Sequence, residues 1–231
     1  MIIEERIVAQ LEVKTIEIER NIQLLRDNLK EQRENHQLRK RSLNKFNRWI
    51  QDLEKILNKI SDVDLKVIPQ IEKNLDIDFS DRNLVLIAMF QPSAATIFSE
   101  INKQFPDVRA LQISQEDMDY LKNGAKLAQS LAWAGDTAVK YAVLFDIWDS
   151  GISTEELHNQ RKSFEANEHL AQLCNNWKLF DYRIHADPDY RKMKSLNRIK
   201  ATLIEAIFGV IFIKNDIEGV KKAIQIFREK N

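Results

Sequence analysis

The sequence predicts an all-α protein. Glycine and proline, the residues that mark turns, number only 5 and 4 in 231 residues, and no segment of any length alternates apolar with polar residues as a strand would. With 44% apolar and 30% charged residues, the composition is that of a folded globular chain. We therefore expect helices joined by short loops along the chain.

The N-terminal region has apolar residues spaced alternately by three and four, the pattern of a coiled-coil seam. The seam residues are Ile18, Ile22, Leu25, Leu29, Leu43, Phe46, Ile50, Leu53, Leu57 and Ile60. Polar residues interrupt the seam between 32 and 39, which leaves two forms open: one long helix that dimerises, or a hairpin of two helices that turns near Asn35. We expect residues 1–69 to form this coiled coil or hairpin, with a boundary at Pro69.

Basic side chains gather in the polar interruption and on both sides of it, with Arg39, Lys40 and Arg41 at their centre. Such a cluster favours a surface that binds phosphate groups. The alternative is an ordinary solvated helix face.

Residues 75–231 are expected to form a compact helical domain. Helices are predicted near 81–90, 92–104, 115–128, 129–148, 153–163, 165–176, 198–212 and 216–229, with Asp216 placed to cap the last one.

Composition excludes several classes of protein. The formal net charge is zero, so any nucleic-acid site must be local rather than a property of the whole surface. The single cysteine, Cys174, allows no intramolecular disulfide and predicts a reducing, cytoplasmic location. No apolar run reaches the roughly 18 residues that a membrane-spanning helix needs, and the acidic N-terminal segment differs from a signal peptide.

Two carboxylates interrupt apolar helices. Glu205 lies within ATLIEAIFGVIFI, and Asp136 follows Gly135 within SLAWAGDTAVKYAVLFDIW. A buried carboxylate needs a partner or a shifted pKa, and two that both stay ionised need a cation between them. Mg²⁺ is the natural candidate, because it is held by one or two carboxylates together with substrate phosphate. The alternative is that each acid faces solvent or pairs with a nearby lysine or arginine.

Over residues 80–229, these motifs in this order resemble the ribonuclease III family. AWAGDTAVKYAVL is similar to the family's signature helix, and IEAIFGVIFIKNDIEGVKKAI to its last motif. RKSFEANEHLAQLCNNWKLFDYRI resembles the connecting segment, whereas the polar motif expected near Gln91 is poorly kept. Acids expected by the family are replaced at Gln129, Ala132 and Thr202. The remaining Ala-Trp-Ala-Gly-Asp and Thr-Leu-Ile-Glu motifs are most similar to the small Mini-ribonuclease III proteins.

The resemblance implies a twofold homodimer that cleaves double-stranded RNA, with Asp136 and Glu205 of each subunit as catalytic residues and ligands of Mg²⁺, Mn²⁺ being an alternative metal. The expected RNA contacts are Arg191, Lys192, Lys194, Arg198, Lys200, Arg39, Lys40 and Arg41. Trp133 and Trp148 are expected to pack in the core or in the dimer. A second hypothesis is a domain that has lost cleavage and serves as an RNA-binding or assembly scaffold.

Overall fold

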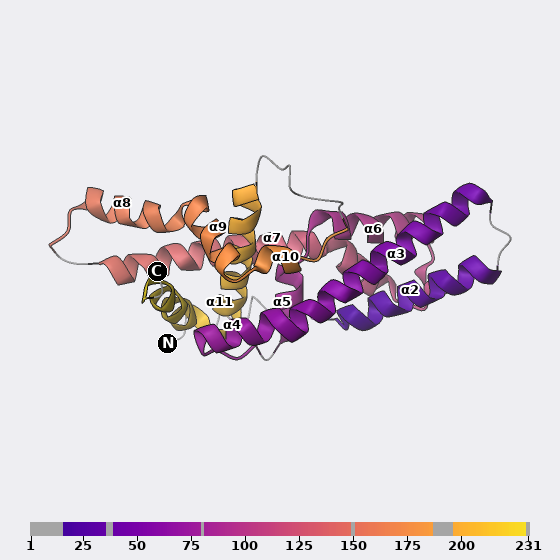
Figure 1. Cartoon of the computed structure of the whole chain (residues 1–231), viewed down its shortest axis with the longest axis horizontal. Helices are drawn as coiled ribbons and strands as arrows, with labels where there is room; N and C mark the ends of the chain where they lie inside the picture. The colour runs from indigo at the N-terminus through magenta and orange to yellow at the C-terminus, as the bar shows by residue number, and fades with distance from the viewer. Residues whose placement is uncertain (1–15, 36–38, 80, 149–150, 187–195, 230–231) are drawn as a thin grey trace.

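The computed structural model describes residues 16–35, 39–79, 81–148, 151–186 and 196–229. In this part of the chain all regular structure is helical, apart from one isolated bridge between Phe90 and Ile184. Figure 1 shows an elongated molecule in which α7 (Gln115–Ile147) runs along the long axis. None of the described helices has the length and apolar character needed to cross a membrane. The all-α prediction is therefore confirmed.

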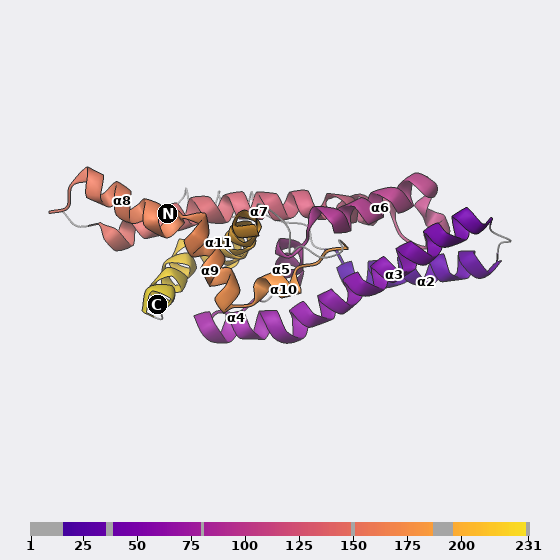
Figure 2. The ribbon, with the colours of Figure 1, turned by 45° about the horizontal axis from the view of Figure 1, so that its top comes forward.

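The N-terminal region has the hairpin form. Helices α2 (Ile18–Asn35) and α3 (Lys40–Asp62) lie side by side (Figures 1 and 2). They run antiparallel, since Lys30 pairs with Glu54 at 2.8 Å while Arg33 donates a hydrogen bond to Asn47 at 3.2 Å. Apart from Leu43, which is 38% exposed, the residues of the predicted seam are buried within this single chain. The three-and-four spacing thus serves contacts between two helices of one chain.

Helix α3 does not stop before the expected boundary at Pro69. It continues through a π-helical turn (Val63–Val67) into α4 (Ile68–Leu75). Within that turn the Ile68 N–H donates to the Val63 carbonyl, five residues back. Proline has no N–H to donate, and it is tolerated in the first turn of a helix. The helical run ends instead at Asp76, which has a left-handed backbone conformation with φ of 50°.

The hairpin is anchored to the rest of the chain through α6 (Pro92–Gln104). Trp49 of α3 is buried and its indole N–H donates to Glu100 of α6 at 2.9 Å, and Arg48 pairs with the same carboxylate. Phe46 packs edge-on against Phe105, with ring centroids 5.9 Å apart. One hydrophobic cluster extends from Ile16 to Phe227. The division into two domains at residues 69 to 75 stays a prediction.

Residues 115–147 form a single helix where two were expected. Its start is fixed by Ser114, whose hydroxyl accepts a hydrogen bond from the Asp117 N–H at 3.0 Å. The sequence holds no proline between there and residue 147, and its many alanines favour a helix throughout. The short helix α5 (Arg82–Ala88) packs beside it.

The chain then returns along α7. Helix α8 (Thr154–Glu165) packs against α7, and α9 (Asn167–Asn176) and the short α10 (Leu179–Tyr182) follow. After α10, Ile184 exchanges backbone hydrogen bonds with the turn between α5 and α6: its N–H donates to Met89 at 2.8 Å, and its carbonyl accepts from Gln91 at 2.9 Å.

The last helical segment, α11 (Leu196–Glu229), crosses α7 (Figure 1). It is broken at Asp216, where φ is 56° and ψ is −169°. The two helices predicted near 198–212 and 216–229 are therefore separated by this break.

Candidate active site

Helices α7 and α11 cross with their backbones in direct contact. A Cβ atom placed on Gly135 would lie 1.9 Å from the carbonyl oxygen of Glu205, and one placed on Gly209 would lie 2.1 Å from that of Leu131. Ordinary contacts of a Cβ atom are 3.4 Å or longer, so at both positions only glycine fits. The glycine beside Asp136 is explained by this close approach.

This crossing brings Asp136 and Glu205 together. Glu205 lies in the turn of α11 that contacts Gly135, and Asp136 is the next residue of α7. Burial and the neighbouring charge of Asp136 raise the pKa of Glu205 to about 7, while Lys140 and Arg198 oppose the rise. The two carboxylates identified from sequence are thus neighbours that repel each other, and Glu205 is only partly ionised at neutral pH.

Lys140 lies against one acid of the pair. Its ammonium donates to Asp136 Oδ2 at 2.6 Å, one helical turn along α7. The hydrogen bond that Lys140 donates to Asp136 raises the pKa of Lys140, with smaller contributions from the charges of Glu165 and Glu205. The sequence contained this contact in the four-residue spacing of Asp136 and Lys140, which faces the two side chains toward each other on one helix.

Glu165, at the end of α8, is a third carboxylate that sequence reasoning missed. Burial raises its pKa, and the charge of Asp136 adds to the rise, against Arg161 and Lys140. Its oxygen Oε1 lies 3.3 Å from Arg161 Nε. No local sequence pattern marks this residue, because its place near Asp136 depends on how α8 packs against α7.

The acidic pair fits a divalent cation that takes only part of its ligands from the protein. Among the described residues, no group of three or more histidine, cysteine, aspartate or glutamate side chains is placed to hold a metal. Two adjacent carboxylates that repel each other do suit Mg²⁺, which takes its remaining ligands from water and substrate phosphate. Asp136 and Glu205 are the residues that would hold it, and Lys140 lies against one of them.

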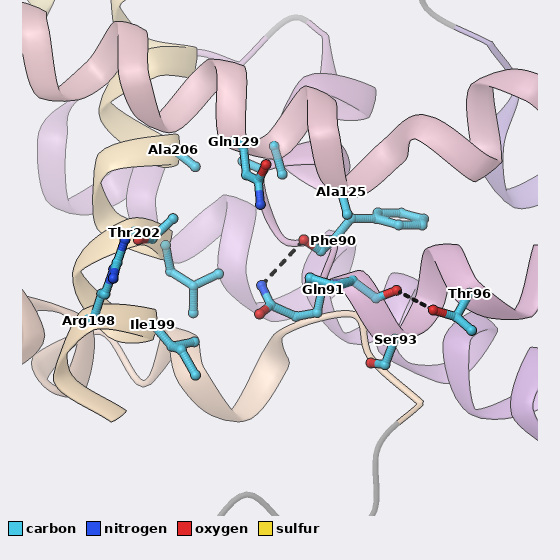
Figure 3. Close-up of a pocket in the computed structure, with 14 residues that line it drawn as sticks. Phe90, Gln91, Ser93, Thr96, Ala125, Gln129, Arg198, Ile199, Thr202 and Ala206 are labelled. Atoms are coloured by element: carbon cyan, nitrogen blue, oxygen red, sulfur yellow. Dashed lines mark hydrogen bonds between the residues drawn. The ribbon is translucent and has the colours of Figure 1, made fainter. Parts of the chain in front are cut away.

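A cavity of about 840 Å³ lies between α7, α11 and the turn before α6. Figure 3 shows Arg198, Thr202 and Ala206 along α11 on one side of it, with Gln129 pointing in from α7. Gln129 and Thr202 are two of the positions where the resemblance expects acids. Both are neutral here, so they add no charged ligand, and the residues that line this cavity do not include Asp136 or Glu205.

Two of the predicted RNA contacts in α11 have different surroundings. Arg198 is exposed, lines the cavity and acts on Glu205. Lys200 is half-buried, donates to Asn175 Oδ1 at 2.6 Å and lies over the ring of Phe180. Of this pair, Arg198 is therefore better placed to meet a ligand. Arg191, Lys192 and Lys194 lie outside the described residues.

Arg39, Lys40 and Arg41 are exposed at the start of α3, at the tip of the hairpin. In both views of the ribbon this tip and α8 lie at opposite ends of the molecule (Figures 1 and 2). The structure does not bring these three residues to the acidic pair.

The expectation of core packing for Trp133 and Trp148 is wrong. Trp133 is 75% exposed and Trp148 is 65% exposed. Tyr141 and Phe145 are also exposed on α7, with ring centroids 4.8 Å apart. The core faces of α7 and α11 are filled by small and aliphatic side chains at their crossing, which leaves no room there for an indole ring. Packing of the two tryptophans in a dimer stays a prediction.

Comparison with known families gives a match over part of the chain. Residues 129–216 match the family model described as the ribonuclease III domain. The matched segment begins at the cavity wall on α7, includes Asp136 and Glu205, and ends at the break in α11. No curated protein matches the chain. The match supports a ribonuclease III family domain in this part of the chain, a family of endoribonucleases that act on double-stranded RNA.

Proposed function

We propose that the protein is a metal-dependent endonuclease that cleaves double-stranded RNA, with Asp136 and Glu205 as its catalytic residues. The observation that carries the proposal is the contact of α7 and α11 at Gly135 and Gly209. It makes neighbours of two acids that are 69 residues apart in sequence, within the segment that matches the ribonuclease III domain.

In this proposal the two acids hold the metal, and basic residues nearby bind the RNA. Asp136 and Glu205 hold Mg²⁺, or Mn²⁺, which supplies Lewis-acid stabilisation of the scissile phosphate and a more acidic water. Arg198 binds an RNA phosphate at the rim of the cavity, with Lys192, Lys194 and Arg191 as further contacts from the preceding segment. Recognition is by phosphates, 2′-hydroxyls and the shape of the A-form duplex, because its deep groove excludes side chains.

The two-acid composition favours the Mini-ribonuclease III type within the family. Ala132 is buried in the crossing, and Thr202 lines the cavity; neither offers a charged ligand. A second candidate function, a non-cleaving RNA-binding scaffold, is favoured by one observation: Asp136 already has a cation, Lys140, at 2.6 Å.

The test of cleavage uses a long, end-labelled RNA duplex with Mg²⁺. Wild type is compared with Asp136→Asn and Glu205→Gln. Asp119→Asn is the matched control, since Asp119 also lies on α7 and also pairs with a lysine, Lys122, at 2.7 Å. We expect wild type and the control to cut, and the two site variants to lose at least about 100-fold in rate. Duplex binding by wild type without cleavage, with either metal, would favour the scaffold instead.

We further propose that the active form is a homodimer in which α7 faces its twofold mate. The support is the exposed aromatic face of α7 formed by Trp133, Tyr141, Phe145 and Trp148. Exposed apolar groups gathered on one helix mark interaction surfaces more often than isolated ones do. Tryptophan and tyrosine are also the residues enriched where interfaces are strongest.

Sedimentation of Trp133→Ser tests the dimer. We expect wild type to sediment as a dimer and this variant as a monomer at micromolar concentration. Leu65→Ser is the control, because Leu65 is exposed to a similar extent, 72%, on the π-helical turn away from α7. A monomeric wild type, or a Trp133→Ser variant that stays dimeric, would contradict this part of the proposal.

We also propose a cytoplasmic location. The buried Cys174, which forms no disulfide, accords with a reducing compartment.

A further inference from the structure

Lys140 lies where a metal ion would make contact with Asp136. Its ammonium is 2.6 Å from Asp136 Oδ2, within hydrogen-bond distance of an oxygen that the proposed site needs as a ligand. The pair is partly open to solvent, with the lysine side chain 44% and the aspartate side chain 32% exposed. An i,i+4 pair of this exposure is weak, so the lysine can move away without unfolding the helix.

The same ammonium also neutralises the acids around it. Lys140 acts electrostatically on Asp136, Glu165 and Glu205, which come from α7, α8 and α11. Arg161 lies beside Glu165, and Arg198 acts on Glu205. Three carboxylates therefore face three basic side chains, so the described cluster is balanced in formal charge without any metal.

We propose that Lys140 is a built-in competitor for the metal: its ammonium is the resident counter-ion of Asp136, and a divalent cation binds only by displacing it. The inference rests on the proposed function, because it assumes that Asp136 and Glu205 are the metal ligands. Its consequence is a weak metal site in the free protein. A duplex phosphate adds a ligand for the metal and a new partner for the displaced ammonium, so RNA strengthens metal binding.

Mn²⁺ binding, measured by the loss of the free-ion electron paramagnetic resonance signal, tests this without any cleavage assay. The full chain is titrated as wild type, as Lys140→Met, which removes the charge and keeps the apolar stem, and as Lys140→Arg, which keeps the charge. We expect Lys140→Met to bind Mn²⁺ about tenfold more tightly than wild type, since a single charge a few ångströms from a divalent ion repels it by about that factor even in water.

Two further variants make the result specific. Lys122→Met removes the lysine that pairs with Asp119 on the same helix, and it should leave Mn²⁺ affinity unchanged. Asp136→Asn combined with Lys140→Met should remove the added affinity, which ties the gain to this carboxylate. Thermal unfolding of each variant is the control that checks whether the fold is kept.

The outcomes separate this inference from the proposed function. Equal Mn²⁺ affinity in wild type and Lys140→Met, or a gain that Lys140→Arg shares, overturns the competitor role and leaves the metal-dependent nuclease standing. Absence of binding in every variant overturns the metal site itself. Binding by Lys140→Met alone supports the competitor role, because it is the extreme case of a metal site that is weak in the free wild-type protein.

Discussion

Replacing Gly135 by alanine tests the crossing that assembles the acidic pair. The new Cβ would lie 1.9 Å from the Glu205 carbonyl oxygen and 2.4 Å from the Gly209 nitrogen. Both are backbone atoms of a packed helix, so α11 must shift by more than 1 Å. Alanine improves helix propensity by about 1 kcal/mol, but we expect the overpacking to cost about 3 kcal/mol or more. The net loss is therefore roughly 2 kcal/mol.

Thermal and urea unfolding of the full chain measure this loss. For a chain of this size, 2 kcal/mol corresponds to a Tm lower by roughly 4–8 °C. Gly124→Ala is the control on the same helix, because its Cβ would meet only the Phe90 ring, at 3.1 Å, and the ring can turn slightly. It should be neutral or slightly stabilising. A Gly135→Ala protein as stable as wild type would refute the backbone contact and, with it, the proximity of Asp136 and Glu205.

Two more predictions concern charge. Because the folded pKa of Glu205 is about 7, above its unfolded value near 4.3, the unfolded chain ionises first as pH rises. Wild type should therefore lose stability between about pH 4 and pH 7, by roughly 2 kcal/mol after allowance for solvent screening. Glu205→Gln, which leaves Asp136, Lys140 and Arg198 around a neutral group, should show a flatter profile in melts across this range; parallel profiles would contradict the assignment. Replacing Arg39, Lys40 and Arg41 together by glutamine should weaken duplex binding and lower the slope of log affinity against log salt by about 2–3. An unchanged slope would exclude the hairpin tip from the RNA contacts.

The sequence predicted those elements whose pattern is local. Periodic apolar residues predict the helices, and the alternating three- and four-residue spacing of the predicted seam also describes the buried faces of the two hairpin helices. A pattern of this kind reports which face of a helix is buried, but it does not report against what. For that reason the spacing fits a long dimerising helix and a hairpin equally well, and the pairing of Lys30 with Glu54 in the structure distinguishes them.

Features that depend on tertiary contacts are harder to predict from the sequence. Gly135 and Asp136 stand out in the sequence because a glycine and an acid are unfavourable in an apolar helix. In the structure Gly135 makes the close contact with α11, and Asp136 lies beside Glu205. The prediction that Trp133 packs in the core is wrong: a large aromatic residue in an apolar stretch usually lies inside, but this one lies on the exposed face of α7. Glu165 lies between Phe164 and Ala166, and no local pattern marks it as part of a site, because only the packing of α8 on α7 brings it near Asp136.

The separation of Gly135 and Gly209 along the chain also constrains the order of folding. Helix α7 can form from local contacts alone, but its crossing partner is synthesised more than 70 residues later. During translation at roughly 5–20 residues per second, Asp136 is therefore without Glu205 for several seconds, and the contact open to it on α7 is the local one with Lys140. A nascent chain cannot assemble the acidic pair until α11 has been synthesised as far as Gly209, so the proposed activity can begin only after that point in translation.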